Sequence, residues 1–207
     1  IPVVAEQAAH LTVFQRTPNF SLPQRNGPLD PKDQRDWKAQ YKKLRREAEK
    51  SRTGMIEDLN EMSALDATAE ELEHECEQRW ANGGFSLLFA YEDILTNEQA
   101  NKLIADFLRN KIRATVNDPD VAELLCPKNH AFATKRPCQD THYYETYNRD
   151  NVTLVDLQQE PIEEITRTGV LTAAGDHPID ILVLATGFDA ITGSMLRLDP
   201  KGRGGIS

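Results

Sequence analysis

The sequence has few cysteines, no excess of positive charge and no long apolar run. Its 207 residues include three cysteines, Cys76, Cys126 and Cys138, which are far apart and form no CxxC pair. This spacing argues against a disulfide framework and predicts reduced thiols, as in a cytoplasmic protein. The longest apolar run, "IDILVLATG", is interrupted by Asp180 and is shorter than the roughly 20 residues that cross a bilayer, so no membrane segment is expected.

Basic residues are outnumbered, with 24 Lys and Arg against 33 Asp and Glu and a formal net charge of −9. Nucleic acids and anionic membranes attract basic surfaces, so neither is expected as a partner. Any site for an anion must therefore be local. Lys135 and Arg136 in "ATKRPCQDTHYYETYNRDNVTLVD" are two adjacent cations that could form such a site.

The order of apolar patterns predicts an α/β fold. The opening "IPVVAEQAAH" is typical of the end of a helix, "LTVFQRT" and "NVTLVDL" predict strands, and "IEEITRTGVLTAAGD" predicts a hairpin around Gly169. The nearly continuous apolar run in "IDILVLATGFDA" predicts a strand covered on both faces, as in a parallel sheet. Between these segments lie four predicted helices, in residues 31–51, 69–80, 96–116 and 118–127, the third with Thr96 as its cap.

Arg16 is a candidate for cofactor binding. It follows the strand "LTVFQ", which the opening helix precedes, and in a dinucleotide-binding βαβ unit the end of the second strand lies near the adenosine ribose. An acidic residue there binds the ribose hydroxyl, whereas arginine accommodates the 2′-phosphate, so Arg16 predicts NADP, with Thr17 adding a hydroxyl. By spacing alone, a surface arginine after an edge strand is the alternative.

Two further segments are candidates on weaker grounds. Lysine is a point charge suited to phosphate and arginine a planar fork, so Lys135 and Arg136 could serve different atoms of a ligand. Solvated cations on a loop are the alternative. Ala185, Thr186 and Gly187 are small residues after an apolar run, where the backbone could approach a ligand closely.

Taken together, "VFQRTPNFSLP", "KRPCQDTHYYETYNRDNVTLVD" and "ILVLATGFDAITG" closely resemble segments of the flavin-dependent Baeyer–Villiger monooxygenases of the cyclohexanone and phenylacetone monooxygenase type. The resemblance is looser in the helical middle, which includes "WANGGF". It implies FAD and NADPH as cofactors. It also implies O2 and a small-molecule ketone as substrates and an ester or lactone as product.

The resemblance implies a role for each candidate residue. Arg16, Thr17 and Lys135 match residues at the 2′-phosphate of NADPH. Arg136 matches the active-site arginine that stabilises the negatively charged flavin peroxide and helps to seat the nicotinamide. The segment Ala185 to Gly187 resembles the ATG element where the NADPH and FAD domains meet.

The resemblance also implies a division of the chain. Residues 1–30 and 129–184 would be parts of a Rossmann-like NADPH-binding domain, 31–128 a helical insertion, and 185–207 the return toward the FAD domain. The family's FAD-binding and NADP-binding glycine motifs and its FxGxxxHxxxWP signature are absent. We therefore interpret the chain as an internal fragment that neither holds FAD firmly nor turns over substrate alone.

Three alternatives stay open at this point. A related flavin monooxygenase could oxidise nitrogen or sulfur in place of a ketone. The basic stretch "WKAQYKKLRREAEKSR" could bind a partner as a non-catalytic helical module, although interleaved acidic residues favour a solvated face. Cys126, His130 and Cys138 could ligate a metal, but their spacing matches no usual zinc pattern, so no metal is expected.

Overall fold

The computed structural model describes residues 1–51, 53–56, 58–187 and 193–205. The chain divides into two compact units, Ile1–Gln159 and Glu160–Ser207. Both contain regular structure, and the predicted α/β class is confirmed at the level of a mixed α/β chain. Within the described ranges no helix is both long and apolar enough to cross a membrane.

Two short parallel sheets lie in the first unit. Helix α1 (Pro2–Gln7) leads into β1 (Leu11–Gln15), which pairs with β4 (Val152–Asp156) in a register that runs from Leu11↔Val152 to Gln15↔Asp156. Both strands were predicted. The second sheet pairs β2 (Ser21–Pro23) with β3 (Cys138–Asp140), and neither of these strands was predicted. Proline at the end of β2 is tolerated because a short strand needs few backbone donors.

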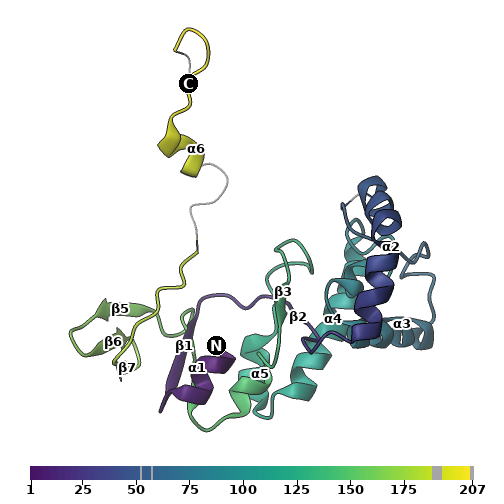
Figure 1. Cartoon of the computed structure of the whole chain (residues 1–207). Coiled ribbons are helices and arrows are strands. Elements are labelled where there is room, and N and C mark those ends of the chain that lie inside the picture. The colour runs from purple at the N-terminus through teal and green to yellow at the C-terminus, as the bar shows by residue number, and fades with distance from the viewer. Residues whose placement is uncertain (52, 57, 188–192, 206–207) are drawn as a thin grey trace. The chain divides into compact units, whose positions relative to one another are not determined.

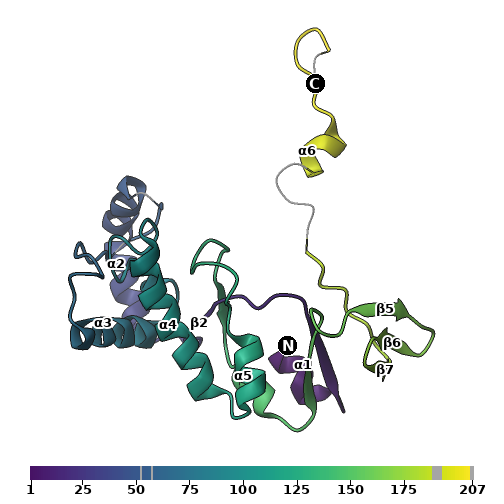
Figure 2. The same ribbon diagram turned by 180° about the vertical axis from the view of Figure 1, so that it is seen from behind.

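The helices of the first unit occupy the middle of its sequence. They are α2 (Pro31–Lys50), α3 (Ala69–Asn82), the 3₁₀ helix η1 (Ser86–Phe89), α4 (Glu98–Thr115), α5 (Pro119–Leu125) and the 3₁₀ helix η2 (Glu145–Asn148). Helices α3 and α4 lie side by side in both views (Figures 1 and 2). Thr68 and Glu71 form a capping box at the start of α3. The predicted cap of α4 was wrong: Asn97, one residue after Thr96, accepts from the first backbone amides, because its longer amide side chain reaches two of them.

The apolar stripe of α4 supplies much of the core. Ile104 and Leu108 are almost fully buried with Phe20 and Tyr91 in one cluster, whereas Ile112 belongs to a second cluster with Tyr144, Tyr147 and α5. Tyr144 and Tyr147 therefore pack in the core. The second cluster also receives side chains from β1 and β4, so it joins the helices to the parallel strands.

Helix α2 has a different character, because none of its residues is buried. Trp37 and Tyr41 are exposed, and three ion pairs of i,i+4 spacing line the helix. These pairs are the solvated arrangement that the interleaved charges favour.

The second unit holds an antiparallel sheet of β5 (Ile162–Ile165), β6 (Gly169–Thr172) and β7 (Gly175–Pro178), followed by α6 (Gly193–Leu198). The predicted hairpin is confirmed, and β7 extends it. The predicted apolar strand in "IDILVLATGFDA" was wrong for its described part. Residues 180–187 form no strand, and Ile181 is 82% exposed, because no described strand pairs with this run.

Candidate functional site

The first candidate segment follows β1 directly. Because β1 and β4 are parallel, Gln15 and Asp156 end side by side. The turn after β4 holds the backbone at the end of β1. The Leu157 N–H donates to the Gln15 carbonyl at 2.9 Å, and the Gln158 side chain donates to the Arg16 carbonyl at 3.0 Å. The Arg16 side chain itself is exposed. Carboxyl ends of parallel strands are common ligand sites, so Arg16 occupies a position suited to binding.

The second candidate segment precedes β3. Its chain leaves the core at Phe132, which is 1% exposed, and turns at Ala133, whose φ is +67°. Lys135 and Arg136 follow with exposed side chains. The Cys138 N–H then donates to the Phe20 carbonyl at 3.0 Å, where the β2–β3 ladder begins. The backbone is thus held on both sides of a solvent-facing pair of cations.

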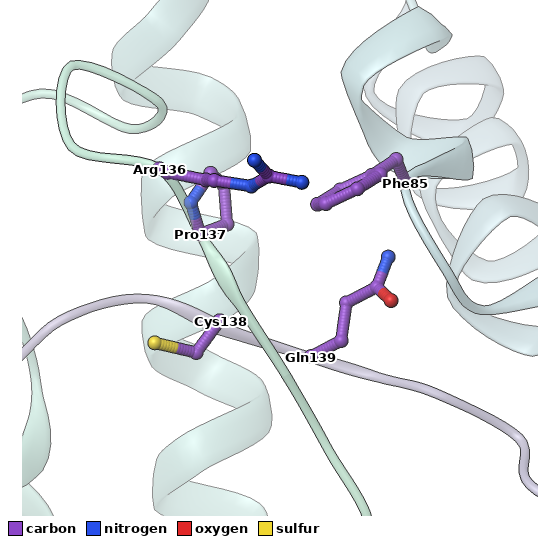
Figure 3. Close-up of a pocket in the computed structure, with 5 residues that line it drawn as sticks. All are labelled: Phe85, Arg136, Pro137, Cys138 and Gln139. Carbon is purple, nitrogen blue, oxygen red and sulfur yellow. The ribbon is translucent and has the colours of Figure 1, made fainter. Parts of the chain in front are cut away.

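Arg136 borders an open hollow of about 420 Å³, lined by Phe85, Arg136, Pro137, Cys138 and Gln139. Figure 3 shows its guanidinium pointing toward the Phe85 ring, and the guanidinium carbon lies 5.5 Å from the ring centroid. This is a cation–π contact, which orients the guanidinium without neutralising it. Cys138 and Gln139 point to opposite sides of β3 because side chains alternate along a strand, and only Gln139 points toward Phe85 (Figure 3).

The structure brings the two segments together through Asn19. Its side-chain Nδ2 donates to the Arg136 carbonyl at 3.0 Å, across 117 positions of sequence. The sequence alone gives no sign of a role for Asn19, because Asn19 comes beside Arg136 only through the parallel pairing of β2 with β3. Phe85 was also given no role, although the "NGG" before it signals a turn.

Electrostatics set these cations apart. Among the described residues, Arg16, Lys135 and Arg136 form no ion pair. Burial, and then the charges of Lys135 and Arg109, lower the pKa of His130 below its ordinary value. Arg16, Lys135 and Arg136 therefore fit an anionic ligand such as a phosphate.

The third candidate segment belongs to the second unit and is described by itself. Ala185, Thr186 and Gly187 are exposed, and Gly187 has φ +92°, a conformation that side-chain-bearing residues rarely adopt. Apart from its chain neighbours, no described residue has an atom within 4 Å of the position that a Cβ would take at Gly187. The predicted continuation from Phe188 to Thr192 lies outside the described residues.

The candidate metal ligands are not gathered into one site. Cys126 is buried and Cys138 exposed, and both are free thiols, as is Cys76. The ring nitrogens of His130 lie near side-chain oxygens of Asn19 and Asn129, at 3.3 and 2.8 Å. Across the ranges that the structure describes there is no group of three or more possible metal ligands.

No protein-family model matches the chain. A Baeyer–Villiger monooxygenase of Pseudooceanicola batsensis is 40% identical over 210 residues, which is 100% of this chain and 38% of that protein. The phenazine N-monooxygenase PhzNO1 of Lysobacter antibioticus is 38% identical over 99% of this chain and 38% of its own length.

Two solved structures superpose closely. A steroid monooxygenase bound to NADP has a TM-score of 0.95 and 47% identity over 99% of this chain and 39% of its own. The OTEMO complex with FAD and NADP has a TM-score of 0.95 and is 38% identical in sequence, and the match covers 99% of this chain and 38% of that chain. The chain is related to one segment of the Baeyer–Villiger monooxygenases. It spans about 38% of the length of the Baeyer–Villiger relative from P. batsensis, and the resemblance seen in its motifs is confirmed.

Proposed function

We propose that this chain is part of an NADPH- and FAD-dependent Baeyer–Villiger monooxygenase, which inserts one oxygen atom of O2 into a ketone to give an ester or lactone. The observation that carries the proposal is the hydrogen bond from Asn19 to Arg136, which joins the segment after β1 that bears Arg16 to the segment before β3 that bears Lys135 and Arg136. None of these cations forms an ion pair with another described residue. In a chain with a net charge of −9, such cations indicate a selected anionic ligand.

The 2′-phosphate of NADPH is the ligand proposed for Arg16, Thr17 and Lys135. The guanidinium of Arg16 offers a planar fork for two phosphate oxygens, and the Lys135 ammonium adds a compact charge. Thr17, partly exposed beside Arg16, adds a hydroxyl donor. NADH lacks this phosphate, so these residues would select NADPH.

Arg136 is proposed as the catalytic cation. The contact with Phe85 directs its guanidinium over the hollow. A fixed cation stabilises negative charge that develops during the reaction far better in a closed site than in water. FAD, when bound, would supply the activation of O2. The exposed backbone of Ala185 to Gly187 would allow a cofactor to approach closely, because Gly187 has no side chain to block it.

The domain division is proposed on the same basis. Helices α2 to α5 all fall within residues 31–128, the proposed insertion, while β1 and β4 fall in the flanking parts assigned to the NADPH-binding domain. The remaining stretch, 185–207, would lead toward the FAD domain.

The decisive experiment compares cofactors in the complete enzyme. Arg16→Ala and Lys135→Ala should each raise the KM for NADPH by roughly 10- to 100-fold, since a charge-assisted hydrogen bond contributes about 1.5–3 kcal/mol. The KM for NADH should change little. Arg136→Ala should abolish ketone oxygenation while NADPH still binds.

Lys38→Ala is the matched control, because Lys38 is an exposed lysine on the surface helix α2. It should leave both KM values unchanged. Equal losses for NADPH and NADH would show that neither Arg16 nor Lys135 reads the 2′-phosphate. Full ester formation by Arg136→Ala would remove its catalytic role.

Oxidation of nitrogen is the second candidate function, which the similarity to a phenazine N-monooxygenase supports. The same cations would serve it, because NADPH binding and charge stabilisation do not depend on the substrate atom that is oxidised. Product analysis of the complete enzyme with a cyclic ketone and with a heteroaromatic amine separates the two candidates.

A further inference from the structure

Asn19 lies two positions after Thr17 and makes contacts in two directions. Its Nδ2 donates to the Arg136 carbonyl at 3.0 Å and lies 3.7 Å from the Cys138 sulfur. Its Oδ1 lies 3.3 Å from Nε2 of His130. A carbonyl oxygen can only accept, so Nδ2 must face Arg136 and Oδ1 must face the histidine. The orientation of the amide is thereby determined.

His130 completes the arrangement. Nδ1 of His130 lies 2.8 Å from Oδ1 of Asn129, so each ring nitrogen faces an amide oxygen, and the ring donates to Asn19 in the tautomer that carries its proton on Nε2. The ring makes an edge contact with buried Phe20, at 5.6 Å between centroids. His130 is therefore anchored to the core, and through Asn19 it holds the carbonyl of Arg136.

We infer that Asn19 is a positioning residue: its side chain bridges His130 and the Arg136 carbonyl, and so holds the Lys135–Arg136 backbone at a fixed place beside the Arg16–Thr17 loop. Within the described chain, no hydrogen bond or ion pair joins the side chains of Arg16, Thr17, Lys135 and Arg136 to one another, and the Asn19 bridge acts on the backbone of Arg136. Coupling the loops keeps the cations at one spacing before a ligand arrives, which lowers the entropy that binding costs. This role in NADPH binding rests on the proposed function.

Asn19→Asp tests the bridge with almost no change in shape. It keeps the acceptor for His130 but replaces the N–H donor by a carboxylate oxygen that repels the Arg136 carbonyl. Asn148→Asp is the matched control, because the Asn148 amide likewise donates to a backbone carbonyl, that of Thr115, at 2.7 Å and in an exposed setting. His130→Leu removes the anchor, whereas His130→Gln restores a donor near Nε2.

The first measurement is amide hydrogen exchange in the complete enzyme without NADPH. The Cys138 N–H, which donates to Phe20, should exchange about fivefold faster or more in Asn19→Asp and His130→Leu. It should stay at the wild-type rate in Asn148→Asp and His130→Gln. An unchanged rate in both Asn19→Asp and His130→Leu, or equal acceleration in Asn148→Asp, would overturn the inference.

The second measurement is the KM for NADPH, expected to rise several-fold in Asn19→Asp and His130→Leu and to recover in His130→Gln. If exchange accelerates while Arg16→Ala and Lys135→Ala leave this KM unchanged, the bridge stands and the proposed phosphate site fails. If those alanine variants raise the KM but Asn19→Asp alters neither exchange nor KM, the phosphate site stands and the bridge fails.

Discussion

The cations of the helical region and those of the two candidate loops are treated differently by the fold. In the helical region Arg79, Arg109, Lys111 and Arg113 each have an acidic partner. On the loops Arg16, Lys135 and Arg136 have none among the described residues, although the chain has nine more acidic than basic residues. Unpaired cations in an acidic protein are the groups to which an external anion would bind, as proposed for these three residues.

The two regions also differ in how their backbone is held in place. The loop segments are held by hydrogen bonds from Gln158, Asn19 and Cys138 to backbone carbonyls, so their positions do not depend on their own side chains. In the helical region, charged side chains join elements to one another, as Lys111 of α4 does to Glu77 of α3. One set of cations therefore contributes to folding, and the other is available for binding.

Arg79 should give the largest effect on stability. Its side chain is 8% exposed and pairs with Glu75 at 2.7 Å and Asp58 at 3.3 Å. Arg79→Met keeps the apolar stem but leaves Glu75 unpaired, so urea unfolding of the chain should show a loss of about 2–4 kcal/mol. Arg46→Met, the same change on exposed helix α2, should stay within about 0.5 kcal/mol. Equal effects at the two sites would remove the distinction between buried and solvated cations.

A smaller, pH-dependent effect is expected at Glu123. Hydrogen bonds from Arg113 and Lys128 lower the pKa of its carboxyl to about 2. A lowered folded pKa contributes stability above the ordinary value near 4.5, and this contribution is lost as the pH falls toward 2. Because the side chain is 42% exposed, solvent screening limits Glu123→Gln to a loss of under about 1 kcal/mol at pH 7.

Urea unfolding at pH 7, 4 and 2.5 checks this expectation. The difference between the parent chain and Glu123→Gln should be constant above pH 5 and shrink below it. A difference that is the same at pH 7 and pH 2.5 would show that charge is not the source of the effect.

Much of the fold could be predicted because its signals are local. The apolar stripe of α4, the capping residues of α3 and the alternation in β1 and β4 all lie within single elements. Thr96 was predicted as the cap of α4 in place of Asn97, because either residue type can cap a helix and the sequence alone does not distinguish between neighbouring candidates. The strand expected at Ile181 failed for another reason: a buried strand is defined by its neighbours, and none of the described strands pairs with it.

The charged residues of the candidate site could be predicted from the sequence, but the residues that hold its backbone in place could not. Arg16 and Lys135 are conspicuous in an acidic chain, and their type indicates an anion. Asn19 and His130 carry no such signal, because an asparagine after a turn and a lone histidine are common on any surface. Their importance comes from the pairing of β2 with β3, two three-residue strands that their sequences do not predict.

The smallest effect on stability is expected at the loop cations themselves. Because they have no acidic partner to lose among the described residues, Arg16→Gln and Lys135→Gln should each change the free energy of unfolding by no more than about 0.5 kcal/mol. Arg136→Gln also removes the cation–π contact with Phe85, which contributes about 0.5–1 kcal/mol at an exposed site. Lys135→Gln should still be detectable locally. After burial, the Lys135 charge is the next cause that lowers the pKa of His130, so its removal should raise that pKa in an NMR titration. A marked loss of stability would contradict the absence of an acidic partner, and an unmoved His130 pKa would show that the Lys135 charge does not act on His130.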